Sequence, residues 1–470
     1  MRKYSLEKNI TLPQFFANSF AKTINSKRRC SRRFGQRTTK RMPTAILIPT
    51  ALKILTRDGW FLFLTRFLRL FAYGSLSVVL VFYLIGLGLS ESQTGLLLTL
   101  TLLGDTAVSL YITTRADRIG RRRMLIVGAI LMAAAGLAFA FTHNLLLLLI
   151  AGTIGVISPS GNEVGPFLSI EQAALSHVVP TNTRTEIFAW YTLFGSVATA
   201  LGALFGGAIT AVLQKQSVTP VNSYRVVVII YAALGLLLAI LFSRLSSASE
   251  VTAPGEKSGL PGSLKSFFGI HHSSNVVIKL SGLFALDSFA GGFVVQSFAA
   301  YWFYLRFGIQ PATLGVIFFW ANVFAGISAL LASSLAARFG LIRTMVATHL
   351  PSNVLLILVP LMPTLSLATL VLLLRFSISQ MDVPTRQSYT MAVVPPEERS
   401  AAAGITGVAR TTGAAISPLF VGFMFARPCL INFPFFIAGT LKILYDLLLY
   451  HQFVSLKPPE EILRKDSGPK

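Results

Sequence analysis

Ionisable side chains inside long apolar stretches are the residues of this sequence that could carry out chemistry. The stretch LLLRFSISQMDVPTRQSYTMAVVP holds four polar residues at spacings of four, three and four: Arg375, Ser379, Asp382 and Arg386. At about 100° per residue, these positions share one face of an α-helix. Charges in an apolar span are costly unless they face a partner or a hydrated path. The pattern indicates a structural Asp382–Arg386 pair, a polar stripe along a translocation path, or both.

A second polar stretch, GVISPSGNEVGPFLSIEQAALSHVVP, is interrupted by glycine and proline at residues 162–166. Pro384 interrupts the first stretch in a similar way. Helices that are interrupted at corresponding positions of two halves indicate a transporter's binding site. We therefore expect the two stretches to line a pathway for substrate or ions, with these residues: Asn162, Glu163, Glu171, Gln172, Asp382, Arg386 and Gln387.

Asp287 lies near the middle of a third apolar stretch, residues 275–305. A desolvated carboxylate there would favour its protonated form and could carry a proton. The alternative is a structural acid that its neighbours satisfy. No metal site is expected, because the two cysteines, Cys30 and Cys429, lie far apart in different regions. No cofactor is expected either, and proton coupling is the open possibility.

Two pairs of opposite charges could meet between the halves of the chain. Glu171 aligns with Arg386 when the halves are superimposed at an offset of 215 residues, so the two could close a gate. The alternative is that each is neutralised within its own half, for instance Glu171 by Arg184. Asp105 and Arg410 lie at similar depths in the second and eleventh predicted spans. We expect them to approach each other in one conformational state and to bias its population.

The elements that must position these residues are transmembrane helices. Of the 470 residues, 53% are hydrophobic and only 13% are charged. Apolar runs of about 20 residues, long enough to cross a bilayer, recur along the chain. In hydrocarbon each backbone polar group must be satisfied internally, which favours an all-α integral membrane protein. We predict twelve spans: 60–88, 91–115, 123–142, 145–175, 186–213, 224–245, 275–305, 312–336, 342–363, 365–391, 400–426 and 432–454.

The spans predict two six-helix bundles, at residues 58–245 and 274–455, joined by a cytoplasmic linker at 246–273. Short loops on one side hold most of the Lys and Arg, which places both termini and the tail 456–470 in the cytoplasm. Residues 1–57 hold fourteen Lys or Arg and a single acid, Glu7. The net charge of +23 therefore comes from loops and a basic tail rather than from a surface that binds nucleic acid.

The first 43 residues are basic, contain Ser and Thr, and are nearly free of acids. This composition fits a cytoplasmic tail that settles on anionic lipid, and it also fits a cleaved transit peptide. The plasma membrane is accordingly the favoured location, with an organelle inner membrane as the alternative.

The halves resemble each other in two places. Residues 178–207 align without gaps on residues 393–422, and the basic loop TTRADRIGRRRML, residues 113–125, has an echo in AARFGLIRTM. Parallel six-helix repeats of this kind are common in transporters.

The basic loop and the six-plus-six layout resemble the major facilitator superfamily, over about residues 60–455. That family carries G-x-x-x-D-R-x-G-R-R between helices 2 and 3, and here Thr113 replaces the leading glycine. The resemblance implies that this loop governs conformational switching, through Asp117, Arg118, Gly120 and Arg121. It also implies that Asp117 docks on the N-terminal end of helix 11, near residues 398–400, where a helix presents partial positive charge. The alternative is that Asp117 only offsets arginine repulsion.

The sequence is similar to the drug-exporter branch of that family, with atypical antiporter motifs. LGALFGG resembles the antiporter motif G-P-x-x-G-G through Gly202, Gly206 and Gly207, but Ala203 replaces the proline. These glycines also have a purely structural interpretation, the close approach of helices. The stretch LLLLLIAGTIGVI lacks the arginine that proton-coupled drug exporters of the family carry in helix 4. Both departures weaken an assignment to drug–proton antiport.

The sequence therefore predicts a secondary transporter that moves a small organic solute across a bilayer by alternating access. A sensor or scaffold on a transporter fold is the alternative. An integral membrane enzyme is disfavoured, since the chain lacks H-E-x-x-H and C-x-x-C motifs. We expect a monomer that binds no nucleic acid. Organic anions, amines and zwitterions fit the polar residues equally well, and the direction of transport and the coupling ion stay open.

Overall fold

The structure is a computed structural model that describes residues 52, 55–161, 167–178, 184–246, 273–395 and 398–456. Over these residues the chain is helical and contains no strand. The predicted tails and most of the predicted linker lie outside the described residues. So do Asn162 and Glu163, and the side chains of residues 114–118 are likewise not described.

The first half of the chain forms six spans. Its helices are α2 (Arg57–Gly86), α3 (Glu91–Ile119), α4 (Arg121–Phe141), α5 (Leu145–Ile154), α6 (Phe167–Val178), α7 (Arg184–Lys215) and α8 (Pro220–Ser243). The fourth span consists of the short helices α5 and α6, and residues 155–161 after α5 are not helical. The span is therefore interrupted, as predicted, and the break begins before residues 162–166, which lie outside the described residues.

The second half repeats this pattern. Its helices are α10 (Ser274–Gly292), α11 (Gln296–Phe307), α12 (Pro311–Phe339), α13 (Leu341–Leu358), α14 (Leu365–Ser379), α15 (Asp382–Ala392), α16 (Arg399–Phe425) and α17 (Phe433–Phe453). The tenth span breaks at residues 380–381, between α14 and α15, and Pro384 is the third residue of α15. The seventh span breaks between α10 and α11, an interruption that the sequence analysis did not predict.

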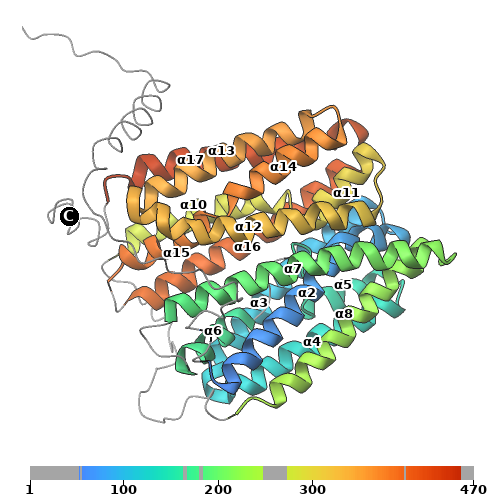
Figure 1. Cartoon of the computed structure of the whole chain (residues 1–470), viewed down its shortest axis with the longest axis horizontal. Helices are drawn as coiled ribbons and strands as arrows, with labels where there is room; N and C mark the ends of the chain where they lie inside the picture. Colours follow the sequence, from blue (N-terminus) through green and yellow to red (C-terminus); the bar gives the residue numbers. More distant parts are fainter. Residues whose placement is uncertain are drawn as a thin grey trace, which may run out of the picture. The chain divides into compact units, whose positions relative to one another are not determined.

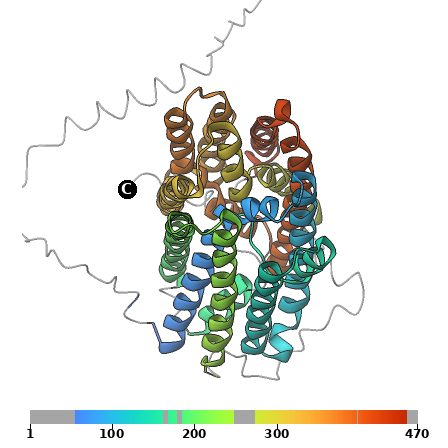
Figure 2. The same cartoon turned by 90° about the vertical axis from the view of Figure 1, so that its right-hand side faces the viewer.

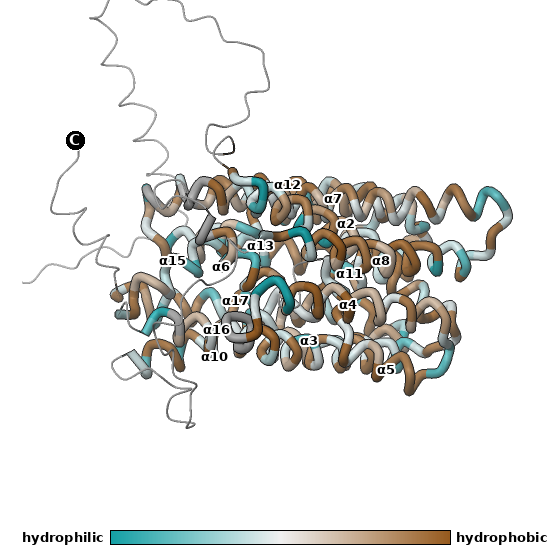
Figure 3. Tube along the Cα trace, turned by 90° about the horizontal axis from the view of Figure 1, so that it is seen from below, coloured by the Kyte–Doolittle hydropathy of each residue, from teal (hydrophilic) through white to brown (hydrophobic). Residues whose placement is uncertain are grey.

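The helices lie side by side as two groups. In Figure 1 the first half (blue to green) and the second half (yellow to red) form adjacent layers, and Figure 2 shows the same two groups after a 90° turn. Hydrophobic residues cover most of the helix length in Figure 3. Eleven stretches of the described residues are long and apolar enough to cross a membrane, and α5 is a shorter apolar helix. With α5 and α6 as the remaining span, the predicted layout of six plus six is confirmed.

The basic loop and its echo have the same backbone geometry. Gly120 precedes α4 with φ of 112°, and Gly340 precedes α13 with φ of 88°. Residues with a Cβ rarely adopt such positive φ values, so glycine is needed where the chain turns between the second and third span of each half. The repeat noted in the sequence is thus also a repeat of backbone conformation.

Glycines of the LGALFGG stretch bring helices into close contact. A Cβ on Gly202 would lie 2.1 Å from the backbone oxygen of Phe71 in α2, and one on Gly207 would lie 2.4 Å from that of Pro311 in α12. Such contacts require a residue without a side chain. The structural interpretation of these glycines therefore accounts for them, and nothing in their packing calls for an antiporter role.

Candidate functional site: a polar pathway between the two bundles

The two bundles contact each other tightly at one end. We call this the closed end; it comprises the helix ends at residues 86–91, 307–311 and 425–433. The opposite end carries Gly120 and Gly340 and is called the basic end. At the closed end, the Phe82 ring lies 5.6 Å from that of Tyr301 and 5.2 Å from that of Tyr304. The Tyr301 hydroxyl also donates to the Glu91 carboxylate, 3.2 Å away.

Polar contacts also join the two bundles nearer the middle of the helices, where the interrupted spans lie. Ser297, just after the break between α10 and α11, donates to the carbonyl oxygen of Pro159 from its amide (3.1 Å) and its hydroxyl (2.5 Å). The side-chain amide nitrogen of Gln296 donates to Ser77 of α2 at 2.8 Å, and its side-chain oxygen accepts from Asn322 of α12 at 3.0 Å. Irregular backbone within a membrane must find such partners. The break in the seventh span is thus used to join the bundles.

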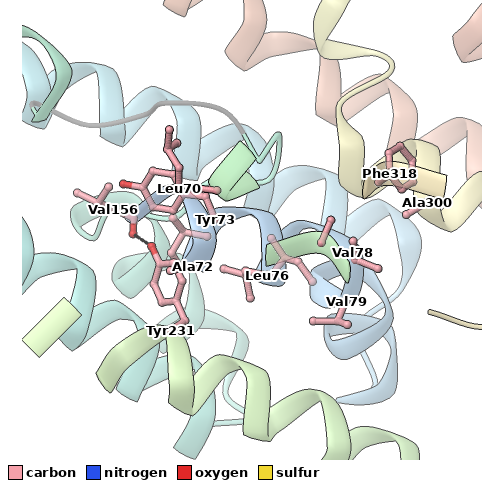
Figure 4. Packing of buried hydrophobic residues seen from close by; sticks show 14 of the residues in the cluster. Leu70, Ala72, Tyr73, Leu76, Val78, Val79, Val156, Tyr231, Ala300 and Phe318 are labelled. Atoms are coloured by element: carbon pink, nitrogen blue, oxygen red, sulfur yellow. Dashed lines mark hydrogen bonds between the residues drawn. The ribbon is translucent and has the colours of Figure 1, made fainter. Parts of the chain in front are cut away.

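The break in the fourth span is also held within its own bundle. The hydroxyl of Tyr231 in α8 donates to the carbonyl oxygen of Val156, as Figure 4 shows. Tyr231 stacks near Tyr73 of α2, with ring centroids 6.2 Å apart. The carbonyl of Val156, which follows the end of α5, is therefore satisfied by a tyrosine from a neighbouring helix.

Helix α16 packs against the first bundle at the closed end and has open space beside it towards the basic end. A Cβ on Gly95 of α3 would lie 2.5 Å from the backbone oxygen of Pro418, and one on Gly422 would lie 2.4 Å from that of Glu91. The same face of α16, followed at helical spacing, continues to Thr411 and to the two residues Gly404 and Gly407. Thr411 and Gly404 are exposed, and a Cβ on either glycine would meet no atom within 4 Å. The helices α3 and α16 therefore separate towards the basic end.

The face of α3 that opposes this opening is polar. Continuing from Gly95 at helical spacing, it carries Thr106, Ser109 and Thr113, all partly exposed. Small polar residues therefore border the space between α3 and α16, with the hydroxyl oxygen of Ser109 itself buried.

Glu171 is neutralised within the first bundle. Its carboxylate accepts two hydrogen bonds from the Arg69 guanidinium, at 2.6 and 2.7 Å, and others from Thr65 and Tyr191. The expected Glu171–Arg386 pair is not formed, because each residue has partners in its own half. The intrabundle alternative is correct, with Arg69 as the described partner; the side chain of Arg184 lies outside the description. Gln172 is half-buried on the next position of α6.

Asp287 is the centre of a buried ion network in the second bundle. Its two carboxylate oxygens accept from Lys442 of α17 at 2.5 Å and from Arg386 of α15 at 3.0 Å. Arg386 also pairs with Asp382 one turn away, at 3.1 Å, as the spacing predicted. Two cationic partners stabilise the ionised form of Asp287. A proton on this carboxyl would therefore require one of the partners to move away.

A histidine extends the network to the peripheral helices of the second bundle. His349 of α13 lies 2.8 Å through Nδ1 from Asp446 of α17 and 3.9 Å through Nε2 from Asp287. Asn353 donates to Asp446 at 2.9 Å. The sequence analysis missed these residues together with Lys442. A signal existed, since His349–Asn353 and Lys442–Asp446 are polar pairs at i, i+4 within apolar stretches.

Arg410 and Asp105 do not form the expected pair in this conformation. The helices α3 and α16 are neighbours, as expected, and Asp105 is buried on α3. The Nε of Arg410 instead lies 3.4 Å from the hydroxyl of Ser288 in α10. Gln387, the remaining residue of the predicted stripe, is exposed on α15.

The structure describes part of the basic loop, residues 113–125, which is expected to govern conformational switching. Asp117 and Arg118 lie in the last turn of α3, and Arg121 is buried at the start of α4. Helix α16 begins at Arg399, where the docking site of Asp117 is expected. The side chain of Asp117 is not described, so the structure does not test this contact. Docking of Asp117 therefore stays a prediction. No group of three His, Cys, Asp or Glu suited to a metal ion occurs in the described part of the chain.

Comparisons with known proteins agree with this arrangement. The family model of the Major Facilitator Superfamily matches residues 62–418. The uncharacterized membrane protein YJR124C of Saccharomyces cerevisiae (strain ATCC 204508 / S288c) is 31% identical over 429 residues, 86% of this chain and 96% of the yeast protein. The quinolone resistance protein NorA of Staphylococcus aureus (strain MRSA252) is 25% identical over 162 residues, 34% of this chain and 40% of NorA. The NorA match agrees with the drug-exporter-like resemblance of the sequence.

A solved structure shares the fold. It is that of a bacterial homologue of the human lysosomal transporter Spinster, in its inward-facing and unoccupied conformation, with a TM-score of 0.62 and 16% identity. The similarity covers 84% of this chain and 94% of that one. The chain therefore belongs to the Major Facilitator Superfamily, a family of membrane solute transporters and not of enzymes, and is itself a multi-pass membrane protein.

Proposed function

We propose that this protein is a secondary active transporter that moves a small organic solute by alternating access. The observation that carries the proposal is the unequal contact between the bundles. They are joined by aromatic and polar contacts at the closed end, whereas α16 is open beside Gly404 and Gly407 at the basic end. A molecule that is closed at one end and open at the other is one of the two states that alternating access requires.

The sidedness of this state follows from charge. The basic end carries Arg121, Arg122 and Arg123 and the echo residues Arg338 and Arg343. Short loops rich in Lys and Arg stay on the cytoplasmic side. The state described is then inward-facing, with both termini in the cytoplasm. The plasma membrane is the favoured location and the monomer the favoured form.

Flux through purified protein tests the proposal. The full chain is reconstituted into proteoliposomes, and radiolabelled organic anions, amines, amino acids, sugars and drugs are tested for counterflow. We expect saturable counterflow of one class, which is lost when Asp287→Asn and Arg386→Gln are introduced together. Binding of a panel member by folded protein without any flux would contradict the transporter proposal and favour a sensor.

Distances between spin labels test alternating access directly. One labelled pair replaces Ser90 and Gln310 at the closed end, and the other replaces Arg123 and Arg343 at the basic end, in a chain without native cysteines. All four positions are exposed. The transported solute should lengthen the first distance and shorten the second in the same population of molecules. Changes in the same direction at both ends, or at one end only, would contradict a rocking motion.

Proton coupling through the second bundle is part of the proposal. His349 stands between the carboxylates of Asp446 and Asp287, so a proton taken up by its ring would give both acids a cationic neighbour. The groups that face this ring are Asp287, Asp382, Asp446, Lys442 and Tyr445. Because Asp287 also holds Arg386 on a helix that lines the pathway, a change of charge at His349 would alter the ion pairs that position α15.

A pH gradient separates proton-coupled from uncoupled transport. Proton movement is followed with a dye trapped in the proteoliposomes while solute is added to wild type, His349→Gln and the control His143→Gln, a change at an exposed histidine outside the network. We expect solute-dependent proton movement in wild type and the control, and its loss in His349→Gln with counterflow retained. Equal proton movement in all three proteins would contradict coupling through His349.

A further inference from the structure

The interior of the second bundle holds more cations than carboxylates. Away from the ends of the spans, the described ionisable side chains are four cations, three carboxylates and one histidine: Arg375, Arg386, Arg410, Lys442; Asp287, Asp382, Asp446; and His349. The sum is at least one positive charge, and it rises by one when His349 is protonated. The other buried carboxylate, that of Glu398, lies at the start of α16 at the basic end and accepts from Ser273. Uncompensated charge within a membrane domain is costly and is kept where it meets a ligand.

The surplus of positive charge can be assigned to particular residues. Each carboxylate already has a partner: Asp287 is held by Lys442 and Arg386, Asp382 by Arg386, and Asp446 by His349. Within the described residues, Arg375 and Arg410 have no carboxylate within 4 Å. The Nε of Arg375 is buried without a hydrogen-bond partner there, and that of Arg410 has only the 3.4 Å contact with Ser288.

Of these two arginines, Arg410 borders the open pathway. On one side of it along α16, Gly413 and Ser417 pack against α10. On the other side, Gly407 and Thr411 border the space that separates α16 from α3. Helical spacing therefore places Arg410 between the packed side and the open side of α16. It is partly exposed, as a residue that meets a soluble ligand must be.

The membrane-exposed surface of α16 is a different one. It carries large exposed apolar residues: Ile416, Leu419, Phe420 and Phe423. At 100° per residue, Arg410 is turned away from Ile416, Leu419 and Phe423 by about 120–180° and from Phe420 by about 80°. A ligand for Arg410 therefore comes from the space between the bundles and not from a lipid headgroup.

We propose that Arg410, with the hydroxyl of Ser288, binds the anionic group of the transported solute, and that the solute is an organic anion. This inference rests on the proposed transport function and narrows its substrate class. A guanidinium matches carboxylates, phosphates and sulfonates through paired hydrogen bonds. Arg375 adds a second positive charge to the field that attracts the anion.

A set of ligands that share one ring and differ only in charge tests the inference. Benzoate, phenyl phosphate and benzenesulfonate are compared with neutral benzamide and cationic benzylamine, at equal ionic strength, by thermal unfolding of the full chain in detergent. The same ligands are then tested for counterflow in proteoliposomes. We expect at least one anion to raise the unfolding midpoint in a saturable way, and benzamide and benzylamine to have no effect.

Variants show whether Arg410 is the binding group. Arg410→Gln should weaken binding of the anion by about ten- to a hundredfold, as expected for loss of hydrogen bonds to a charged group. Arg410→Lys should restore part of the affinity, because it restores the charge without the planar fork. The control is Arg427→Gln, which removes the same charge just beyond the other end of α16, where Arg427 is exposed. Its affinity for the anion should equal that of wild type.

The other outcomes distinguish failure of the inference from failure of the transport proposal. Saturable binding and flux of benzylamine or benzamide alone would overturn it while leaving the transport proposal intact. Anion binding that is equal in wild type and Arg410→Gln would overturn the assignment to Arg410. A chain that binds none of the anions, yet transports a neutral or cationic solute, would exclude an organic anion substrate. A chain that binds an anion through Arg410 without flux would support the site and contradict the transport proposal instead.

Discussion

Glu171 and Arg69 form a bidentate ion pair, with oxygen–nitrogen distances of 2.6 and 2.7 Å and both side chains fully buried. The pair joins α2 to α6, the part of the interrupted fourth span nearer the basic end. Tyr191 of α7 donates to the same carboxylate, so three helices meet at one acid. This link fixes α6 to α2 and α7.

Breaking this pair from one side should destabilise the protein strongly. Glu171→Gln leaves Arg69 buried without its counter-charge, and removing one partner of a buried ion pair costs about 3–5 kcal/mol. The double variant Glu171→Gln/Arg69→Met should recover much of that loss. Thermal unfolding in detergent measures the effect, with Gln172→Ala, the half-buried neighbour, as the control. Equal destabilisation by the single and double variants would show that the pair is not what holds α6.

The network around Asp287 should respond unequally to the loss of either partner. Lys442→Met leaves Asp287 paired with Arg386, whereas Asp287→Asn leaves Lys442 without any carboxylate partner among the described residues. We therefore expect Asp287→Asn to lower the unfolding midpoint more than Lys442→Met, and Lys442→Met to rescue Asp287→Asn in the double variant. The midpoints of the three purified variants decide this. A larger loss for Lys442→Met would contradict the assignment of the pairs.

Alanine at closely packed glycines should shift the conformational balance. A Cβ at Gly95 or Gly422 would overlap with the backbone of the partner helix, and overpacking of this kind costs about 1–3 kcal/mol. The strain is relieved when α3 and α16 move apart at the closed end. Spin labels at Ser90 and Gln310 should therefore show a larger population of long distances, about five- to a hundredfold.

Gly404→Ala is the matched control, because it lies on the same face of α16 in open space. It should leave the distance distribution unchanged and slightly favour the helix. A shift in Gly404→Ala as large as that in Gly95→Ala would mean that helix propensity, and not contact between the bundles, sets the balance.

The hydrogen bonds that join the broken spans should also hold the closed end together. Gln296→Ala removes the link to both Ser77 and Asn322, and Ser297→Ala removes the hydroxyl contact to Pro159. Each hydrogen bond contributes about 0.5–1.5 kcal/mol, so we expect the open population at the closed end to rise about two- to tenfold per bond lost. Labelling rates of a cysteine placed at Ala300, a buried residue one turn after Gln296 and Ser297 in α11, measure this opening.

Ser377→Ala is the control for Ser297→Ala, because it also removes a serine hydroxyl. Ser377 donates to the carbonyl of Leu374 within its own helix, at 2.7 Å, and makes no described contact with the first bundle. Ser377→Ala should therefore leave the labelling rate unchanged. If Ser297→Ala behaved like Ser377→Ala, the hydroxyl of Ser297 would have no part in closure.

Local sequence alone determined the helices and several of their details. Apolar runs long enough to cross a bilayer predicted all twelve spans, because this signal depends only on neighbouring residues. Glycine and proline near residues 162–166 marked the interrupted fourth span, and the spacing of Asp382 and Arg386 predicted their contact, since residues four apart meet on any helix. The echo of the basic loop predicted the shared turn that Gly120 and Gly340 form.

Tertiary structure decided which charges meet. Glu171 and Arg69 are separated by 102 residues, and Asp287 and Lys442 by 155. Depth in the membrane was legible from the sequence, and depth alone suggested Glu171–Arg386 and Asp105–Arg410, neither of which is formed. A charged side chain at a given depth can face any of several neighbouring helices. Which partner it meets depends on the rotation and packing of its own helix. Those are set by contacts such as Gly202 against Phe71, which only the folded chain brings together.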